Sequence, residues 1–234
     1  MISRARETGR AAIDEPSAKR ALVAAGIRVP SGVEVSGPDE IESAVQGLAA
    51  PFALKAISPD IIHKSEAGAV ALQLNDAPAI RSAMEQMTQR TQDAGHRLEG
   101  FLIEEMAPPG HAIVIGGVRD QSFGPVVMFG LGGIMVEVLR DVVFRICPIT
   151  PIDAREMIAE LRGSAILAGA RGGMVIPEAV LVDTLLAVGG ANGLLMSLPE
   201  DIAEVDINPL LVSATGAIAV DARFILAAER WRGA

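Results

Sequence analysis

Aromatic residues and cysteine are scarce in this chain of 234 residues. Phe, Trp and Tyr together make up 3% of it, tyrosine is absent, and Cys147 is the single cysteine. So few aromatic rings argue against a protein that stacks nucleic-acid bases, and a lone cysteine excludes an intrachain disulfide. A reducing cytoplasm therefore fits best. Because 50% of the residues are hydrophobic, a sizeable core is expected, built from Ala, Val, Ile, Leu and Met.

Runs of positive charge and long apolar segments are also missing. The formal net charge is -9 and no cluster of Lys and Arg stands out, so a nucleic-acid partner is not expected. The longest nearly apolar run, residues 124–136, is too short and too rich in glycine to span a membrane. No apolar segment follows the arginines near the N-terminus, so no export signal is expected. A small anionic ligand remains compatible with this charge.

The first part of the chain has the pattern of a mixed α and β lobe. Helices are expected at residues 14–27, 38–48 and 76–93, and strands at 51–58, 70–74 and 100–106. After the last strand, "APPG" contains two prolines and a glycine, which cannot continue a strand. We therefore expect one lobe of residues 1–104, including the leading helix, and a second lobe of residues 105–234.

The second lobe has a similar mixed pattern. Strands are expected at 112–118, 124–130 and 142–149, helices at 151–168 and 177–197, and two further strands within 203–223. Two lobes joined by a short hinge leave a cleft between them, which is where small ligands commonly bind. The fold class is therefore α/β, with α+β lobes around a cleft.

Two lysines of the first lobe lie in unusual surroundings. Lys55 interrupts the apolar strand "FALKAI", where a lysine either faces solvent or pairs with a negative group. From this lysine alone, the solvated face is favoured. Downstream, "HKSEAGAV" places His63 and Lys64 before small residues and Gly68, a composition that lets backbone N–H groups approach a phosphate. The lysines and the loop suit a polyphosphate ligand, and a merely solvated loop is the alternative.

Two features of the second lobe have structural alternatives. "MFGLGGIMVE" offers Gly130, Gly132 and Gly133, with Glu137 beyond, but close packing explains such glycines equally well. Arg145 in "VFRIC" is a candidate phosphate contact. A surface arginine with a buried stem is the simpler explanation for it.

Polar residues interrupt the last two strands. "EVDINPLLV" and "AIAVDARFIL" carry Asp206, Asn208 and Asp221 where a sheet would bury Val or Ile. A hairpin can place Asn208 and Asp221 side by side, with oxygen atoms that suit Mg²⁺ together with waters and substrate phosphates. In the alternative, Asp206 and Asn208 only form a turn before Pro209. That alternative does not account for Asp221.

The order of these motifs resembles the ATP-grasp subunit of NDP-forming acyl-CoA synthetases. The resemblance is to the beta subunit of ADP-forming acetyl-CoA synthetase and, more distantly, to that of succinyl-CoA synthetase. It covers nearly the whole chain, from "EPSAKRALVAAGIRVP" to "VDARFIL". It rests on "LKAISPDIIHKSEAG", "VRDQSFGPVVMFGLGGIMVEVLRDVVFR" and "EVDINPLLV", which occur in the family's order and spacing. The resemblance implies an ATP-grasp fold with two lobes around a nucleotide cleft.

The resemblance implies a nucleotide site for ATP or ADP in this chain. Lys55 and Lys64 would contact the phosphates, and Gly68 would belong to the phosphate loop. Glu105 and Met106 would offer backbone groups to the adenine at the hinge between the lobes.

The resemblance also implies a metal site and a phosphate carrier. Asn208 and Asp221 would hold Mg²⁺. His63 would carry a phosphoryl group transiently, as in the acetyl-CoA synthetase branch, and a neutral imidazole is a suitable nucleophile near cytoplasmic pH. The alternative for His63 is a loop histidine without a role.

The chain departs from the family's pattern at three places. Ala112, with His111 beside it, stands where a glutamate is expected to hold the ribose. Gly68 and Ala69 replace the usual pair of glycines, and a Cβ at Ala69 would narrow the approach of the backbone to a phosphate. "RGGMVIPE" replaces the usual proline-rich motif.

The resemblance implies one subunit of an enzyme that converts an acid, CoA and ATP into acyl-CoA, ADP and phosphate. The chain would pass a phosphoryl group between the nucleotide and a phosphohistidine of a CoA-binding alpha-type subunit, so a cytoplasmic hetero-oligomer is expected. The alternative is a degenerate ATP-grasp module that binds nucleotide or such a partner without catalysis. Ala112 favours this alternative, whereas the joint retention of His63, Lys55, Asn208 and Asp221 opposes it.

Overall fold

The computed structural model describes residues 2–61, 64, 66–133 and 139–227. Two compact units divide the chain: the small unit, Pro30–Ala107, and the large unit, Met1–Val29 together with Pro108–Ala234. The leading segment, which the sequence analysis grouped with the first lobe, belongs to the large unit. The reason is that β1 (Ala12–Ile13) pairs with β11 (Ala222–Leu226), and that Leu22 of α2 (Glu15–Ala24) is buried in the core of the large unit.

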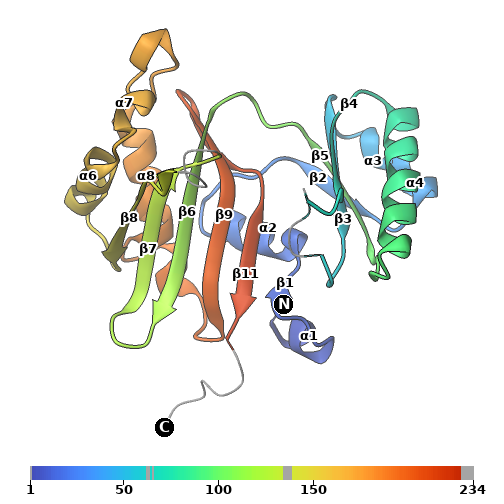
Figure 1. The fold of residues 1–234 in the computed structure, drawn as a ribbon, viewed down its shortest axis with the longest axis horizontal. Coiled ribbons are helices and arrows are strands. Elements are labelled where there is room, and N and C mark those ends of the chain that lie inside the picture. The colour runs from blue at the N-terminus through green and yellow to red at the C-terminus, as the bar shows by residue number, and fades with distance from the viewer. Residues whose placement is uncertain (1, 62–63, 65, 134–138, 228–234) are drawn as a thin grey trace. The chain divides into compact units, whose positions relative to one another are not determined.

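The small unit is an antiparallel sheet with helices against one face (Figure 1). Its described strands are β2 (Gly32–Val35), β3 (Phe52–Ile57), β4 (Val70–Leu74) and β5 (Gly100–Glu105), in the order β2-β5-β3-β4. Its helices are η1 (Pro38–Glu40), α3 (Ile41–Val45) and α4 (Ala77–Asp93). Side chains alternate along β3 and β5, so that Leu54 and Ile103 join the core with the helices, and Lys55 and Glu104 face away from it.

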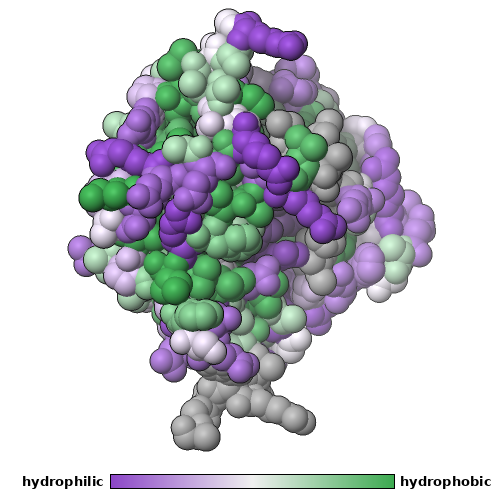
Figure 2. All heavy atoms as spheres, turned by 60° about the vertical axis from the view of Figure 1, so that its left-hand side comes forward, coloured by the Kyte–Doolittle hydropathy of each residue, from purple (hydrophilic) through white to green (hydrophobic). Residues whose placement is uncertain are grey.

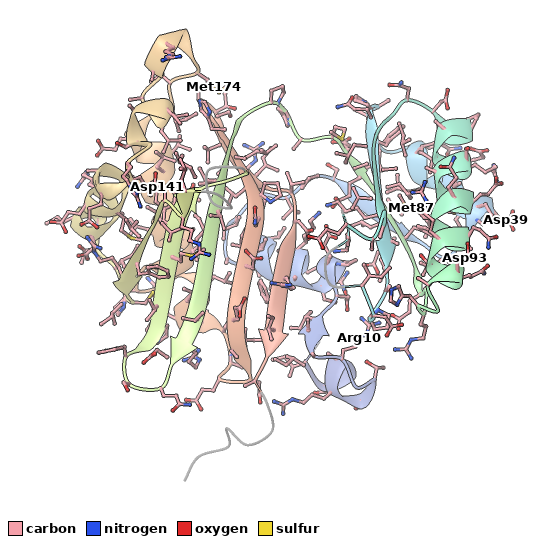
Figure 3. All side chains as sticks on the ribbon, viewed as in Figure 1. Arg10, Asp39, Met87, Asp93, Asp141 and Met174 are labelled. Atoms are coloured by element: carbon pink, nitrogen blue, oxygen red, sulfur yellow. The ribbon has the colours of Figure 1, made fainter. Side chains whose placement is uncertain are left out.

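The start and the buried face of α4 follow from its sequence. Asp76 is the N-cap and accepts a hydrogen bond from the N–H of Ala79 (2.8 Å). Ile80, Met84 and Met87 recur at helical spacing and are buried. Figure 3 shows Met87 on the side of α4 that faces the strands. The helix predicted for residues 76–93 is therefore confirmed, and it covers the core side of the small sheet.

The large unit is built on a wider antiparallel sheet (Figure 1). Its remaining strands are β6 (His111–Asp120), β7 (Gly124–Leu131), β8 (Val142–Ile146), β9 (Ile202–Ser213) and β10 (Gly216–Ala219). The described strands lie in the order β1-β11-β9-β6-β7-β8, and β10 pairs with β9. Its other helices in the described ranges are α1 (Ile2–Glu7), α6 (Pro151–Glu160), α7 (Ser164–Leu167), η2 (Ala170–Gly172), α8 (Glu178–Gly189) and α9 (Leu194–Ser197).

The two helices predicted for 151–168 and 177–197 are each broken into two. The backbone of Leu161 is extended after α6, and the buried carboxylate of Asp141 accepts hydrogen bonds from the N–H groups of Arg162 (2.9 Å) and Gly163 (2.8 Å) (Figure 3). After α8 the backbone of Gly190 is extended as well. Apolar periodicity alone did not reveal these breaks, because the residues on both sides of each break contribute to the same core.

One face of the large sheet is buried by helices, and the opposite face is exposed in β8 and toward the end of β6. Val118, Phe144 and Ile146 are 45%, 53% and 54% exposed, whereas Ile115 and Phe129 are fully buried. Figure 2 brings the left-hand side of Figure 1 forward and shows hydrophobic surface interspersed with hydrophilic residues. Across the described ranges, no helix is long and apolar enough to cross a membrane.

Candidate functional site

A β-bulge interrupts β9 at Asn208. Ile207 pairs with Ile115 of β6, but Leu210 pairs with Ile113, so two residues of β9 stand opposite one residue of β6. On the other side of β9, the break between β10 and β11 faces the same place. The polar residues that interrupt these strands in the sequence therefore lie where both neighbouring ladders are irregular.

Asn208 and Asp221 lie opposite each other at this bulge. The N–H of Asn208 donates to the carbonyl oxygen of Asp221 (3.2 Å), and the N–H of Val220 donates to that of Pro209 (3.0 Å). Asn208 is exposed and Asp221 is partly exposed. The structure thus brings together the two residues expected to share a site, on adjacent backbone segments.

Asn208 and Asp221 carry amide and carboxylate oxygens, the type of ligand that Mg²⁺ prefers. Oδ1 of Asp221 accepts a hydrogen bond from the N–H of Ala222 (2.8 Å), which orients the carboxylate. Asp206, which lies two residues before Asn208, has its Oδ2 3.6 Å from Nη2 of Arg223 and so takes part in an ion pair. In the described part of the chain, no group of three or more His, Cys, Asp or Glu could hold a metal ion. A cation here would need waters and substrate phosphates besides Asn208 and Asp221, which is the coordination that Mg²⁺ accepts.

Lys55 is buried and paired in the small unit. It is 3% exposed, and its Nζ lies 2.9 Å from Oε2 of Glu104 on β5. The solvated face that the sequence alone favoured is therefore wrong. Lys55 pairs in register with Leu102, so Glu104 stands diagonally across from it on the same face of the sheet. The carboxylate offsets the cost of burying the ammonium group.

A tight turn follows Lys64. The N–H of Ala69 donates to the carbonyl oxygen of Lys64 (2.8 Å), and the carbonyl oxygen of Ala69 accepts from the N–H of Ala56 (2.9 Å). Gly68 has a φ of 63°, in the left-handed region that favours glycine. Ala69 is 2% exposed and belongs to the core of the small unit, so its Cβ packs inward and does not narrow the approach to a phosphate. His63 lies outside the described residues.

Arg90 contacts the same turn, although the sequence analysis did not single it out. A Cβ built on Gly68 would lie 3.0 Å from Nη1 of Arg90 and 3.5 Å from its Cδ. The missing side chain at Gly68 therefore leaves room for the guanidinium group. Arg90 belongs to the last turn of α4. Its contact with Gly68 depends on how α4 packs in the fold, and hydrophobic periodicity in the sequence does not indicate it.

Glu105 and Met106 lie at the end of β5. The N–H of Glu105 donates to the carbonyl oxygen of Ser31 (2.9 Å), and the N–H of Met106 donates to that of Pro51 (2.9 Å). Oε1 of Glu105 accepts from the N–H of Ala49 (2.8 Å). Both N–H groups are thus bonded within the small unit. An adenine bound here would have to use carbonyl oxygens or displace these bonds.

Ala112 lies in β6, where the family pattern has a glutamate. Its carbonyl oxygen accepts a hydrogen bond from the N–H of Gly132 (2.8 Å), and a Cβ on Gly132 would lie 3.0 Å from the Cβ of Ala112. Nε2 of the neighbouring His111 donates to the carbonyl oxygen of Met174 (2.9 Å), in the segment "RGGMVIPE" (Figure 3). His111 therefore supports this segment, and Ala112 packs against the end of β7.

Gly130 of β7 and Arg145 of β8 have structural contacts. A Cβ on Gly130 would lie 2.8 Å from the carbonyl oxygen of Asp141, which supports close packing as the reason for the glycine. Glu137 lies outside the described residues. Arg145 forms an ion pair with Glu160 of α6, and this hydrogen bond raises the pKa of Arg145 and lowers the pKa of Glu160. Arg145 therefore joins β8 to α6.

Comparison with known proteins gives a consistent result. A family model described as an ATP-grasp domain matches residues 4–226. The beta subunit of acetate–CoA ligase (ADP-forming) I from Pyrococcus furiosus is 42% identical over 228 residues, which are 97% of this chain and 96% of that protein. Acetate–CoA ligase (ADP-forming) I from Archaeoglobus fulgidus is 38% identical over 212 residues, which are 89% of this chain and 30% of that protein.

Solved structures resemble the chain over nearly its full length. The dinucleotide forming acetyl-coenzyme A synthetase 1 of Ca. Korarchaeum cryptofilum, in complex with coenzyme A, Ca-AMPCP and HgCl+, matches with a TM-score of 0.90 and 35% identity, over 97% of this chain and 98% of that chain. The same synthetase with coenzyme A and Mg-AMPPCP, its phosphohistidine segment pointing towards the nucleotide binding site, matches with a TM-score of 0.81 and 34% identity, over 97% of this chain and 98% of that chain.

Proposed function

The chain belongs to the ATP-grasp domain family, and from this premise we propose that it is the nucleotide-binding beta subunit of an ADP-forming acetate–CoA ligase. Such an enzyme converts an acid, CoA and ATP into acyl-CoA, ADP and phosphate. The observation that carries the proposal is the 42% identity over 97% of the chain to a beta subunit of this kind. The proposed reaction consumes ATP and CoA, and Cys147 is the single cysteine of the chain. We therefore propose that the protein is located in the cytoplasm.

In the proposed mechanism the chain exchanges a phosphoryl group with a CoA-binding alpha-type partner. In the direction of synthesis, the terminal phosphoryl group of ATP moves to a histidine nitrogen of the partner and ADP remains. The phosphohistidine then gives the phosphoryl group to the acid, and the thiol of CoA displaces phosphate from the acyl phosphate. His63 is proposed as a second, transient carrier in this chain, because a neutral imidazole is nucleophilic near neutral pH.

The described residues have distinct proposed roles in this transfer. Lys55 and Lys64 neutralise charge on the phosphates, and Glu104 holds the ammonium group of Lys55 in one position through the ion pair. Asn208 and Asp221 hold Mg²⁺. When bound, the cation supplies further neutralisation of the charge on the phosphates.

Thermal unfolding with and without nucleotide tests the proposal. A ligand that binds only the folded state stabilises it by about 2.7 kcal/mol at a concentration 100 times its Kd. We expect ADP or ATP to raise the Tm of the chain in the presence of Mg²⁺. We expect the Mg²⁺-dependent part of this rise to be lost in Asp221→Asn. Asp183→Asn is the matched control, because Asp183 is an exposed carboxylate of α8 in the same unit, and it should retain the whole rise.

Two results would change the proposal. If nucleotide does not raise the Tm of the chain with or without its partner, the chain is not a nucleotide-binding subunit. If nucleotide binds but no phosphoryl group reaches the partner's histidine, the chain is a degenerate module, a reading that Ala112 in place of the family's glutamate favours.

A further inference from the structure

Among the described residues of the acidic small unit, one arginine has no acidic partner. Residues 30–107 contain twelve Asp and Glu against five Lys and Arg. Arg81 pairs with Glu42 (3.1 Å) and Arg97 pairs with Glu99 (3.6 Å). Among the residues whose structure is described, by contrast, no ion pair or side-chain hydrogen bond holds the guanidinium of Arg90.

The helix itself offers Arg90 a partner that the arginine does not use. Asp93 follows three residues later, a spacing that allows an ion pair on the surface of a helix. Its carboxylate instead accepts a hydrogen bond from Nε2 of Gln89 (2.8 Å), near the end of α4 (Figure 3). Arg90 extends to Gly68, whose Cβ position would lie 3.9 Å from the Cζ of the guanidinium. Its side chain is therefore directed to the turn rather than along the helix.

The turn that Arg90 contacts is fixed to the sheet. We call residues 66–69 the Gly68 turn. Ala69 anchors its end through hydrogen bonds to Lys64 (2.8 Å) and to Ala56 of β3 (2.9 Å), and its side chain is buried. Gly68 has the left-handed conformation that brings the chain round without a Cβ in the way. The guanidinium group of Arg90 thus lies against a hydrogen-bonded turn that begins two residues after Lys64.

We propose that Arg90, together with Lys64, binds a phosphoryl group at the Gly68 turn. The inference rests on the proposed function and deepens it, because it adds a residue of α4 to the phosphate site. A guanidinium group presents paired N–H donors that match two oxygens of a phosphoryl group, whereas an ammonium group acts as a point charge. The phosphoryl group has two sources in the proposed reaction, the terminal phosphate of ATP and a phosphohistidine.

A structural role for Arg90 is the competing explanation. Arg90 is the basic residue in the last turn of α4, where a positive charge stabilises a helix through its dipole. A lysine at this position would serve the dipole equally well but would not provide the paired donors. The variant Arg90→Lys therefore separates the two roles.

The experiment compares Arg90→Gln, Arg90→Lys and the control Arg81→Gln. The control removes the same charge from the same helix, at a site whose arginine is already paired with Glu42. Two quantities are measured: the Kd of ATP and of ADP with Mg²⁺ for the chain, and the rate of phosphoryl transfer from ATP to histidine in the enzyme assembled with its CoA-binding partner. We expect Arg90→Gln to lower transfer, ATP affinity or both by about 10- to 100-fold. Arg90→Lys should lose less, and Arg81→Gln should stay within about twofold of the unmodified protein.

The pattern of loss identifies the source of the phosphoryl group. Weaker binding of ATP with unchanged binding of ADP assigns Arg90 to the terminal phosphate of the nucleotide. Slower transfer with unchanged affinity for both nucleotides assigns it to the phosphohistidine. Either pattern supports the proposal. If Arg90 only stabilised the end of the helix, its loss would change the Tm but would change neither the nucleotide affinity nor the rate of transfer.

The proposal is overturned if Arg90→Gln matches Arg81→Gln in both affinity and transfer. It is also overturned if Arg90→Lys loses as much as Arg90→Gln while both variants melt at a lower temperature, because the effect would then be structural. Absence of any effect of nucleotide on the unmodified chain and its complex is a different result. It would overturn the proposed function and this inference with it.

Discussion

Lys55 is stable inside an apolar strand because a carboxylate lies beside it. Both members of the pair are almost completely buried, at 3% exposure for Lys55 and 2% for Glu104. Removing one member of such a pair leaves a buried charge and costs about 3–5 kcal/mol. We therefore expect Glu104→Gln to lower the free energy of unfolding by about 3 kcal/mol and to weaken nucleotide binding, since Lys55 loses its fixed position.

Urea denaturation of the single and double variants measures this coupling. Lys55→Met with Glu104→Leu replaces both charges by apolar groups, and the double variant should be more stable than the sum of the single effects predicts. Arg81→Gln, whose salt bridge is exposed, should change the stability by less than about 1 kcal/mol. Strictly additive effects of Lys55→Met and Glu104→Leu would contradict the pairing.

The same two residues show how far single positions can be predicted from the sequence. The sequence shows that Lys55 needs either solvent or an anion, but it does not show which one. The answer depends on the register of β3 with β5, which places Glu104 diagonally across from Lys55. The contact between Asn208 and Asp221 was easier to predict, because the short hairpin of β9 and β10 sets the register that brings the residues after β10 opposite Asn208.

At the scale of elements, the start of α6 is a capping box. The hydroxyl of Thr150 accepts a hydrogen bond from the N–H of Asp153, and the carboxylate of Asp153 accepts from the N–H of Thr150 (2.7 Å). The hydroxyl of Thr150 also donates to this carboxylate (2.6 Å), and these bonds lower the pKa of Asp153 from its ordinary value of 3.8. The stabilisation of the folded state by the ionised Asp153 carboxylate is therefore fully present above pH 3.8. It is lost as the pH falls through the lowered pKa of Asp153.

Substitution of Thr150 by alanine tests this cap. We expect Thr150→Ala to lower the free energy of unfolding by about 1 kcal/mol at neutral pH. The difference from the unmodified protein should shrink below about pH 3.8, because protonated Asp153 no longer benefits from the hydroxyl. Thr215→Ala, in the exposed turn between β9 and β10, is the control. A deficit that stays constant from neutral to acid pH would show that Asp153 is not involved.

Element types were predicted more reliably than element ends. The strand at 70–74 was predicted with its observed bounds, because this short apolar run lies between segments that contain polar residues. The helices predicted for 151–168 and 177–197 were wrong in their continuity, since Asp141 holds one break from a distant strand end. The Cβ of Ala69 was expected to narrow the approach of the backbone to a phosphate, and only its place in the core shows that this Cβ points elsewhere.

At the scale of the whole molecule, the assignment of the leading segment depends on a pairing between strands that are far apart in the sequence, β1 and β11. Residues 1–29 precede the small unit in the chain, but β1 completes the sheet of the large unit by pairing with β11. Proximity along the chain suggested the opposite grouping. The sequence carries no local signal for this pairing, because the register of Ala12 with Ile225 joins two ends of the chain.

The proposed function predicts a division of labour between two polypeptides. In a relative from Archaeoglobus fulgidus, the part similar to this chain is 30% of the protein, whereas in the Pyrococcus furiosus beta subunit it is 96%. The steps on acid and CoA are proposed to lie on a partner. We therefore expect the 234 residues alone to bind nucleotide with Mg²⁺ but to form no acyl-CoA from acetate, CoA and ATP.

Chromatographic detection of acyl-CoA, before and after a separately purified alpha-type subunit is added, tests this division. Activity should appear only in the mixture, and a complex larger than either polypeptide should be seen by light scattering. Asp221→Asn should form the same complex but lose most of the activity, because Asp221 is proposed to act on the nucleotide and not on the partner. Acyl-CoA formed by the chain alone, and lost in Asp221→Asn, would place the whole reaction on one polypeptide and remove the need for the partner.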